Sequence, residues 1–364
     1  MSTTKQFAPF SCNYTPQFAQ LLHNLGISLI ISTYQAGKVV VLSPVEEDKL
    51  IQLPRSYKSA MGLATEGNHR IAIAGLSEVT VLQNSGALAK GYPQKKGVYD
   101  GMYFPRATYY TGNLFLHDMA FSGDKLIAVN TLFSCLSYID DKYSFTPFWK
   151  PDFISELAAE DRCHLNGMAL ENNEVRYVTA LGNNDTAQGW RDNKMQGGIL
   201  MDVPSGEILL EGLGMPHSPR IYNGKLYLLN STQGELICVD IEKKNYEVVC
   251  KLGGYARGMD RFGDYLFIGV SKLRHNSPVF RDLPIAETSY SGVIAVHLPY
   301  GSIAGHIKYE VSVDEIYDVK VLPGLKRPSV LSPEMPVHKR ALHIPETTFW
   351  SAGEEKENQS PVMD

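Results

Sequence analysis

The chain repeats one short unit, and this repeat limits the folds open to it more than any other feature. In each copy a strand-like run ends in a tight polar turn, and a second run that is apolar or alternating follows. The clearest copies begin at Gly62, Asp118, Gly167, Ser218 and Gly258. Their turns contain Gly-Asp, Asn-Asn or Asn-Gly, which tolerate the positive φ of tight hairpin turns. The repeat therefore predicts a series of β-hairpins.

A second hairpin follows the first one in each repeat. Examples are GGILMDVPSGEILLEG from Gly197 and GELICVDIEKKNYEVVC from Gly234. Each repeat thus contains the strands of one β-propeller blade. A single blade cannot bury both of its faces, so such repeats pack side by side around an axis. Five complete blades can be counted along the chain.

The two ends of the chain together supply one more blade. EIYDVKVLPG from Glu315 is typical of an innermost strand that lacks a blade, whereas the runs from Ser28, Lys38 and Lys49 are three strands that lack an innermost one. A shared blade closes the ring and removes the exposed edges of an open sheet. We therefore predict an all-β, six-bladed β-propeller over residues 28–324, after a lead-in at 1–27; one miscounted pair of strands would give five or seven blades.

The composition changes after about residue 325. Four prolines are followed by the polar stretch SAGEEKENQSPVMD, which has few apolar residues. Such a segment cannot bury enough apolar surface to offset the entropy of ordering its backbone. We expect a Pro-rich and largely disordered tail over 325–364, with the patch from Thr347 to Trp350 as its one anchor.

The innermost strands can be aligned on their shared apolar position. One residue of each blade then stands at the same height: Met61, His117, Asn166, His217, Arg257 and Tyr317. Two residues earlier stand Ser59, Phe115, His164, Met215, Tyr255 and Glu315. Residues two apart in a strand share a face. The alignment predicts that the polar members of both sets face the central channel: His117, His164, Asn166, His217, Arg257, Glu315 and Tyr317.

Long insertions are expected at one rim of the ring, where they would surround the mouth of the channel. They cover residues 91–113, 141–163, 183–196 and 272–291. Long ordered loops over such a mouth often carry binding residues. Asp185, Trp190 and Arg191 are our candidates in these loops for contact with a ligand.

Three histidines of the aligned sets form a candidate metal site. His117, His164 and His217 are predicted to lie in adjacent blades, and neutral imidazoles of this kind bind Zn²⁺, Fe²⁺, Mn²⁺ or Cu²⁺ with positions left open for water or substrate. Glu315 is a candidate fourth ligand or general base. The other interpretation is that these histidines only bind the waters of a polar channel.

The remaining aligned residues are candidates for binding and proton transfer. Arg257 has the planar fork that suits a carboxylate, sulfate or phosphate, although an ion pair with Glu315 or Asp318 is the competing interpretation. Tyr255 and Tyr317 either donate protons or line the channel wall. We predict catalytic roles for Glu315 and Tyr317, and substrate-binding roles for Arg257, Asn166, Trp190, Arg191 and Tyr255.

Several classes of function lack support in this chain. Lys and Arg number 34 against 39 Asp and Glu, without a run of like charge, so we expect no binding to nucleic acid or to a membrane surface. No apolar run approaches the length that spans a bilayer, and we expect a cytoplasmic protein. GxSxG, P-loop, HExxH and GxGxxG motifs are absent from the sequence.

Long motifs of the chain resemble those of the DUF4915 family, a bacterial group of uncharacterised proteins. They include FSCNYTPQFAQLL, SLIISTYQAGKVVVL, CHLNGMAL, GWRDNKMQGGILMDVPSGE, MPHSPRIYNGKLYLLNS, GYARGMD and EIYDVKVLPG, and they cover nearly the whole chain before the tail. The resemblance implies a propeller and no particular reaction. The architecture is also similar to that of gluconolactonase, strictosidine-synthase-like and arylsulfotransferase propellers, but the carboxylate and asparagine metal set of a lactonase is missing.

Two classes of function follow from these residues. The first is a metal-dependent hydrolase, lyase or oxidase that acts in the channel on a small anionic or peptide-like substrate. The second is a non-catalytic propeller that binds a peptide, glycan or protein at the loop-rich rim. A metal-free transferase with an axial histidine as nucleophile is a third option. The sequence does not indicate an oligomeric state.

Overall fold

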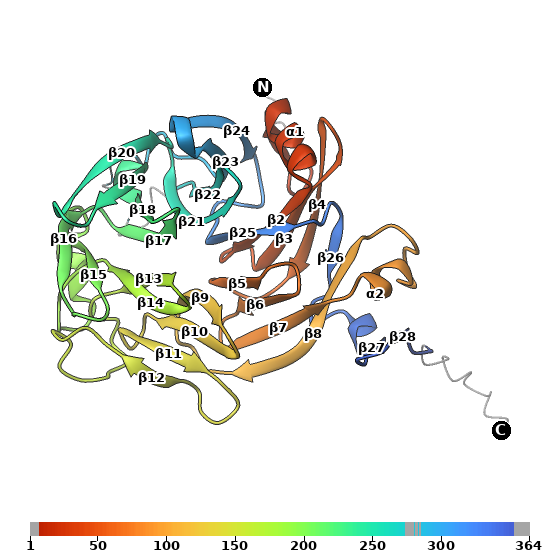
Figure 1. Ribbon diagram of the computed structural model, residues 1–364, viewed down its shortest axis with the longest axis horizontal. Coiled ribbons are helices and arrows are strands. Elements are labelled where there is room, and N and C mark those ends of the chain that lie inside the picture. The colour runs from red at the N-terminus through yellow and green to blue at the C-terminus, as the bar shows by residue number, and fades with distance from the viewer. Residues whose placement is uncertain (1–6, 274–279, 281–282, 284, 353–364) are drawn as a thin grey trace, which may run out of the picture.

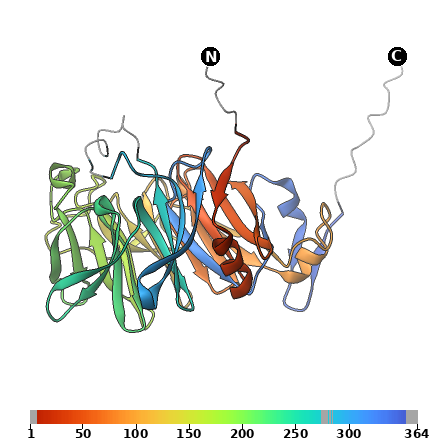
Figure 2. The ribbon, with the colours of Figure 1, turned by 90° about the horizontal axis from the view of Figure 1, so that it is seen from above.

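The computed structural model describes residues 7–273, 280, 283 and 285–352, and it confirms the six-bladed β-propeller. The sheets are arranged around a central axis, whose surroundings we call the channel, and one strand of each blade lies innermost (Figure 1). Seen from the side, the ring is a thick disc whose strands cross from one face to the other (Figure 2). Among the described residues, no helix combines the length and the apolar character that crossing a bilayer requires.

Neighbouring strands within each blade are antiparallel, and we number the blades from 1 to 6 around the ring. Blade 1 contains β25 (Asp318–Pro323), β2 (Ile27–Thr33), β3 (Lys38–Glu46) and β4 (Lys49–Ser56). Blade 2 contains β5 (Leu63–Glu66), β6 (Arg70–Ala74), β7 (Glu78–Asn84) and β8 (Gly101–Tyr110). Blade 3 contains β9 (Leu116–Ser122), β10 (Lys125–Asn130), β11 (Cys135–Ile139) and β12 (Thr146–Trp149).

The other blades follow the same order from the channel outward. Blade 4 contains β13 (Leu165–Glu171), β14 (Glu174–Ala180), β15 (Gly198–Asp202) and β16 (Ile208–Leu213). Blade 5 contains β17 (Pro216–Tyr222), β18 (Lys225–Asn230), β19 (Glu235–Asp240) and β20 (Asn245–Lys251). Blade 6 contains β21 (Tyr255–Phe262), β22 (Tyr265–Ser271), β23 (Gly292–His297) and β24 (Ser302–Tyr309).

Strands from both ends of the chain close the ring, as predicted. β25 pairs with β2 in blade 1, in a register that runs from Ser32 opposite Asp318 to Ile27 opposite Pro323. The lead-in adds β1 (Cys12–Tyr14) to the outer edge of β24, followed by α1 (Pro16–Leu25). Phe18 of α1 is fully buried in the core that blades 1 and 6 share. The lead-in thus covers an edge strand that would otherwise be exposed.

Small residues alternate with polar ones just inside the channel mouth, at the position after the aligned axial residues. Blades 2, 4 and 6 have glycine there, whereas blades 3, 5 and 1 have a side chain that accepts a backbone N–H of the next blade. The glycines are Gly62, Gly167 and Gly258, and the acceptors are Asp118, Ser218 and Asp318. A Cβ on Gly167 would lie 2.5 Å from Pro219 Cδ of the next blade. The alternation therefore lets the inner strands approach closely.

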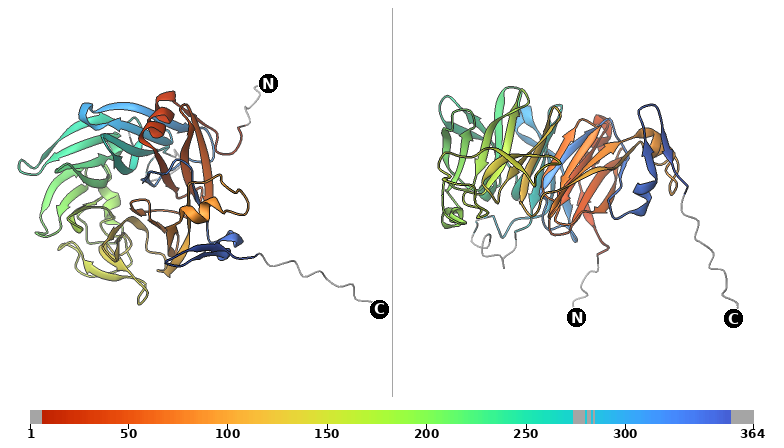
Figure 3. Two further views of the ribbon diagram at one scale, coloured as in Figure 1. Left: turned by 45° about the vertical axis from the view of Figure 1, so that its right-hand side comes forward. Right: turned by 90° about the horizontal axis from the view of Figure 1, so that it is seen from below.

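The segment after residue 325 differs from our expectation of a largely disordered tail. β26 (Pro328–Val330) pairs in parallel with β8, and η4 (Pro336–Arg340) leads into a hairpin of β27 (Ala341–His343) and β28 (Thr348–Trp350). Trp350 donates its indole N–H to Leu88 O in α2 (Gly86–Lys90) at 2.9 Å, so this anchor is as predicted. The C-terminal hairpin lies beside α2 in both views of Figure 3. The few apolar residues suffice because they pack against an existing blade. Residues 353–364 lie outside the described residues.

The predicted insertions are also partly corrected. β8 occupies much of 91–113, and residues 91–100 join β7 to β8 at the end of the ring opposite the mouth. β12 lies within 141–163, so only the part after it reaches the mouth. The segment 183–196 joins β14 to β15 and contains η1 (Gly189–Asn193) at the mouth, as predicted. The insertion 272–291 lies partly outside the described residues.

Candidate functional site

The aligned axial residues converge at the start of the innermost strands. The ring of His117 lies 4.7 Å from that of His164 and 5.1 Å from that of Tyr317, between centroids. The rings of His217 and Tyr255 are 5.9 Å apart. Residues from blades 1, 3, 4, 5 and 6 thus meet at the mouth of the channel.

The geometric reason for this convergence differs from the one we used. We assumed extended backbone, but four residues of the earlier set have positive φ: Ser59, Phe115, His164 and Met215, between 49° and 53°. The left-handed conformation is rare in residues other than glycine and costs free energy. It turns the chain sharply into each inner strand. The simple rule that residues two apart share a face therefore does not apply there.

His117 and His217 are held in the same way. In each, Nδ1 is hydrogen-bonded to the carbonyl oxygen two residues earlier, at 2.9 Å from Phe115 O and 2.8 Å from Met215 O. A buried hydroxyl also contacts each Nδ1, from Thr131 at 2.8 Å and from Ser231 at 2.9 Å.

These hydroxyls determine which ring nitrogen bears the proton. The hydroxyl of Thr131 donates to Leu165 O, and that of Ser231 donates to Ala256 O, each in the next blade. A hydroxyl has one proton to donate, so it accepts from the imidazole. Nδ1 is therefore the protonated nitrogen in His117 and His217, and Nε2 keeps a free lone pair.

Burial also keeps both imidazoles neutral. Desolvation lowers the pKa of His117 well below its ordinary value, and the nearby His164 lowers it further. Desolvation lowers the pKa of His217 in the same way, with an added contribution from the positive charge of Arg257. Both residues thus act as neutral groups near pH 7.

The buried His217 predicts a pH dependence of stability. Below about pH 6.5 the unfolded protein binds a proton at this histidine that the folded protein does not bind. The free energy of unfolding therefore decreases as the pH is lowered, by up to about 1.4 kcal/mol per pH unit. Urea unfolding of the wild type and of His217→Asn between pH 7 and pH 5 tests this. The variant should have the shallower slope, whereas His69→Asn, at an exposed turn, should keep the wild-type slope. Equal slopes in all three proteins would contradict the prediction.

His164 is paired with a carboxylate that our sequence reasoning missed. Its Nδ1 lies 2.8 Å from Asp161 Oδ1 and 3.0 Å from Oδ2. Trp190 donates its indole N–H to the same carboxylate at 3.0 Å, and its ring lies 4.5 Å from that of His164. The spacing Asp-x-x-His in DRCHLNG was the available signal, but its loop has no periodicity that would orient Asp161.

Two loops are tied together around this pair. Arg162 binds Asp185 at 2.8 Å and Glu160 at 2.8 Å, and Gln188 N donates to Glu160 O at 3.0 Å. Asp185, which we had named as a ligand candidate, thus connects the two loops. These contacts hold Asp161 and Trp190 in place beside His164.

Arg257 and Glu315 form the ion pair that was one of our two interpretations. Nη2 of Arg257 contacts Glu315 Oε1, and the guanidinium lies 4.1 Å above the ring of Tyr317. Desolvation raises the pKa of Tyr317 well above its ordinary value. Tyr317 therefore keeps its proton near pH 7.

The other predicted binding residues occupy different environments. Asn166 is buried, and its amide donates to Pro216 O at 2.9 Å and accepts from Thr179 at 2.8 Å, so it links blades 4 and 5. Tyr255 is buried with its hydroxyl 3.7 Å from Met215 Sδ. Arg191 lies with its guanidinium 4.6 Å from the Trp190 ring. Of these residues, Arg191 reaches the larger cavity described next.

Two cavities open among these residues. The larger, of about 560 Å³, is lined by His117, Asp161, His164 and Arg191 among others. The smaller, of about 70 Å³, is lined by Arg257 and Glu315 among others. The mouth thus combines a carboxylate–histidine pair, neutral imidazoles and a buried guanidinium.

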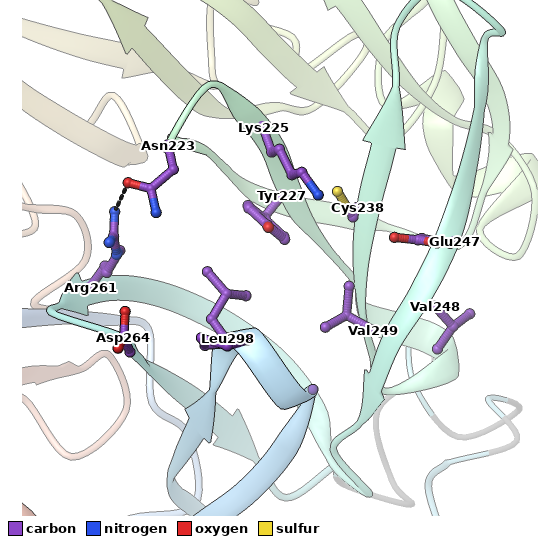
Figure 4. A pocket seen from close by; sticks show the side chains of 12 residues that line it. Asn223, Lys225, Tyr227, Cys238, Glu247, Val248, Val249, Arg261, Asp264 and Leu298 are labelled. Carbon is purple, nitrogen blue, oxygen red and sulfur yellow. Dashed lines mark hydrogen bonds between the residues drawn. The ribbon is translucent and has the colours of Figure 1, made fainter.

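Another cavity, of about 440 Å³, lies between blades 5 and 6 at the opposite end of the ring (Figure 4). Its side chains include Cys238, Glu247 and Arg261, and Arg261 is hydrogen-bonded to Asn223 at 2.9 Å. Desolvation raises the pKa of the Cys238 thiol. A protonated thiol is a poor nucleophile, so the mouth of the channel remains the better candidate for chemistry.

The metal interpretation has one supporting and one opposing observation. Histidines that bind metals usually donate the other ring N–H to a carbonyl or carboxylate, as His117, His164 and His217 are placed to do. However, no group of three or more His, Cys, Asp or Glu side chains is arranged to hold a metal ion within the part of the chain that the structure describes.

Comparison with known proteins supports the fold. A family model described as "Domain of unknown function (DUF4915)" matches residues 16–331. No curated protein matches the chain. A chain in a crystal structure of a nidogen/laminin complex has 13% identity and a TM-score of 0.53, over 82% of this chain and 99% of that chain. A protein of unknown function from Bacteroides caccae has 7% identity and a TM-score of 0.50, over 81% and 98%.

Proposed function

The chain belongs to the DUF4915 family, and we propose that its propeller holds an active site at the loop-rich mouth of the channel. In this proposal His164 is a general base that acts on a small anionic substrate in a hydrolytic or lyase reaction. The observation that carries it is the contact of Asp161 with Nδ1 of His164, on the wall of the larger cavity. This contact leaves Nε2 as the nitrogen that accepts a proton.

Each neighbour supports that role in a specific way. The Asp161 carboxylate selects the Nδ1–H tautomer and stabilises the imidazolium that forms when Nε2 takes a proton. The indole N–H of Trp190 fixes the carboxylate. His117 stays neutral because its pKa is lowered by burial. It therefore adds no positive charge to oppose that on His164.

Cationic groups support an anionic substrate. Arg191 lines the larger cavity and Arg257 the smaller one. A guanidinium binds a carboxylate or phosphate through paired N–H donors. Such contacts would orient the substrate before proton transfer. Glu315 is bound to Arg257, so we assign the base to His164 rather than to Glu315.

A metal-dependent reaction is the second candidate. The supporting observation is that Nδ1 of His117 and of His217 donates to a carbonyl, so Nε2 is the ring nitrogen that carries the lone pair. These nitrogens and that of His164 would hold the ion, after side-chain movement, and the ion would supply an activated water. A propeller that only binds a peptide, glycan or protein at the same mouth is the non-catalytic alternative.

The test compares the turnover of a panel of carboxylate esters, phosphate esters and lactones by untagged wild type, Asp161→Asn and His164→Gln. Turnover is measured as proton release. Each variant should lose activity by a factor of about 10² to 10⁴. His306→Gln, in β24 on the outer side of blade 6, is the matched histidine control and should retain activity. Full activity in folded Asp161→Asn and His164→Gln proteins would refute the general base.

Metal analysis of the same preparations separates the candidates. Stoichiometric metal that disappears in a His117→Ala, His217→Ala double variant would support the metal-dependent reaction. Activity without metal would support the Asp161–His164 pair acting alone. Binding without turnover across the panel would support the non-catalytic alternative.

A further inference from the structure

Arg257 has more hydrogen-bond donors than the protein satisfies. Its side chain is nearly inaccessible, with 8% of the residue exposed. Nη2 contacts Glu315, but Nε is buried and has no hydrogen-bond partner within the described residues. Buried N–H groups are nearly always paired, because leaving one unpaired costs about 1–3 kcal/mol. The guanidinium therefore lacks an acceptor.

The smaller cavity provides a place for that acceptor. Its volume of about 70 Å³ is more than twice the roughly 30 Å³ that one water occupies in the liquid. Arg257, Lys272 and Gln35 line its wall and have donor groups, and among the described residues of the wall Glu315 has the one carboxylate. A compact anionic group matches this size and this excess of donors.

The two partners of the ion pair are not held equally. Arg257 lies in β21 with its guanidinium 4.1 Å above the ring of Tyr317, which fixes the plane of the group. Glu315 lies in the irregular segment between β24 and β25, where Asp314 O accepts from Lys272 N and Ile316 N donates to Ser271 Oγ, so its backbone is held and its flexible side chain is the part that can move. A movement that separates the pair is therefore a movement of Glu315.

We propose that Arg257 forms an anion subsite and that Glu315 occupies it in the empty protein as an internal competing carboxylate. The ligand is the carboxylate or phosphate group of a small molecule, which binds the free donors of Arg257 and displaces Glu315. This inference rests on the proposed function, since it names the charged group of that substrate. It requires no turnover, so it can hold even if the proposed function fails.

Calorimetric titration at constant ionic strength tests the subsite with two probes, inorganic phosphate and acetate. Glu315→Gln removes the competing carboxylate and should bind the preferred probe at least about tenfold more tightly than wild type. Arg257→Lys keeps the charge but loses the planar fork, and should bind at least about tenfold more weakly than Glu315→Gln. Arg261→Lys, at the opposite end of the ring, should bind both probes with the affinity of wild type.

The outcomes distinguish the ligand class and the two proposals. Tighter binding of phosphate or of acetate to Glu315→Gln supports the subsite and identifies the class. Equal binding to wild type, Glu315→Gln and Arg257→Lys, or no binding to any of them, overturns it. If Glu315→Gln does not fold, Glu315→Asp replaces it and should show an intermediate gain. Binding in this pattern without any turnover would leave the subsite intact and count against the proposed enzyme.

Discussion

Replacing Gly258 with alanine is expected to destabilise the propeller by about 3–5 kcal/mol, a large part of the total stability of an ordinary domain. Gly258 has a φ of 77°, where an alanine is strained. A Cβ there would lie 2.5 Å from Asp318 Cα and 2.8 Å from Val319 N. These atoms belong to the backbone of the next inner strand and cannot move without shifting blade 1. The free energy of urea unfolding measures the effect.

Gly263 provides the matched control in the same hairpin. Its φ of 58° is also left-handed, but among the described residues no atom other than those of its chain neighbours lies within 4 Å of the place that a Cβ would take. Gly263→Ala therefore reports the cost of backbone strain alone, about 1 kcal/mol. The difference between the two variants is the cost of the clash between blades. If both variants lose the same stability, close approach of the inner strands is not what Gly258 provides.

The second large effect is expected at Arg220, which lies below the mouth. Nη1 and Nη2 bind Asp118 Oδ2 and Oδ1 at 2.8 Å and 3.0 Å, and Nη1 also donates to Met168 O at 2.7 Å. The contacts connect blades 3, 4 and 5. Arg220→Met leaves a buried carboxylate without its partner, which should lower the free energy of unfolding by about 3–5 kcal/mol.

Two further variants separate ion pairing from packing. Asp118→Asn combined with Arg220→Met removes the unpaired charge while keeping an acceptor for Met168 N, so it should recover much of the loss. Arg70 binds Glu66 at similar distances, but in an exposed position. Arg70→Met should therefore cost less than about 1 kcal/mol. A loss in Arg220→Met no larger than in Arg70→Met would show that burial adds nothing to the Asp118 pair.

Much of the architecture could be predicted because it depends on local patterns. The turns Asn172-Asn173 and Asn223-Gly224 show positive φ at both residues, as expected of tight hairpins. The strands that close the ring were identified because each end of the chain carried an incomplete blade. Aligning equivalent strands then indicated most of the residues that meet at the mouth, since a repeat places equivalent residues at one height. Asn166 is the exception, because its side chain links blades 4 and 5 instead.

The candidate site was predicted less completely, because its partners come from loops. Asp161 and Trp190 contact His164 only after the segments around 150–164 and 183–196 pack together through Arg162. No periodic pattern indicates that contact. The tail was misjudged for a related reason. Few apolar residues lie near Trp350 in its own segment, but its ring packs against Tyr92 and its indole N–H donates to Leu88 O, both in blade 2.

The sequence by itself thus determined the propeller, its closure and the ring of axial residues, because hairpin turns, alternation and repeats act over a few residues. Only the tertiary structure decided which tautomer His117 and His217 adopt, which carboxylate pairs with His164 and which group holds Arg257. These choices depend on hydrogen bonds between blades and between loops distant in the chain. Burial then sets the charge of each group, and burial exists only once the ring has closed.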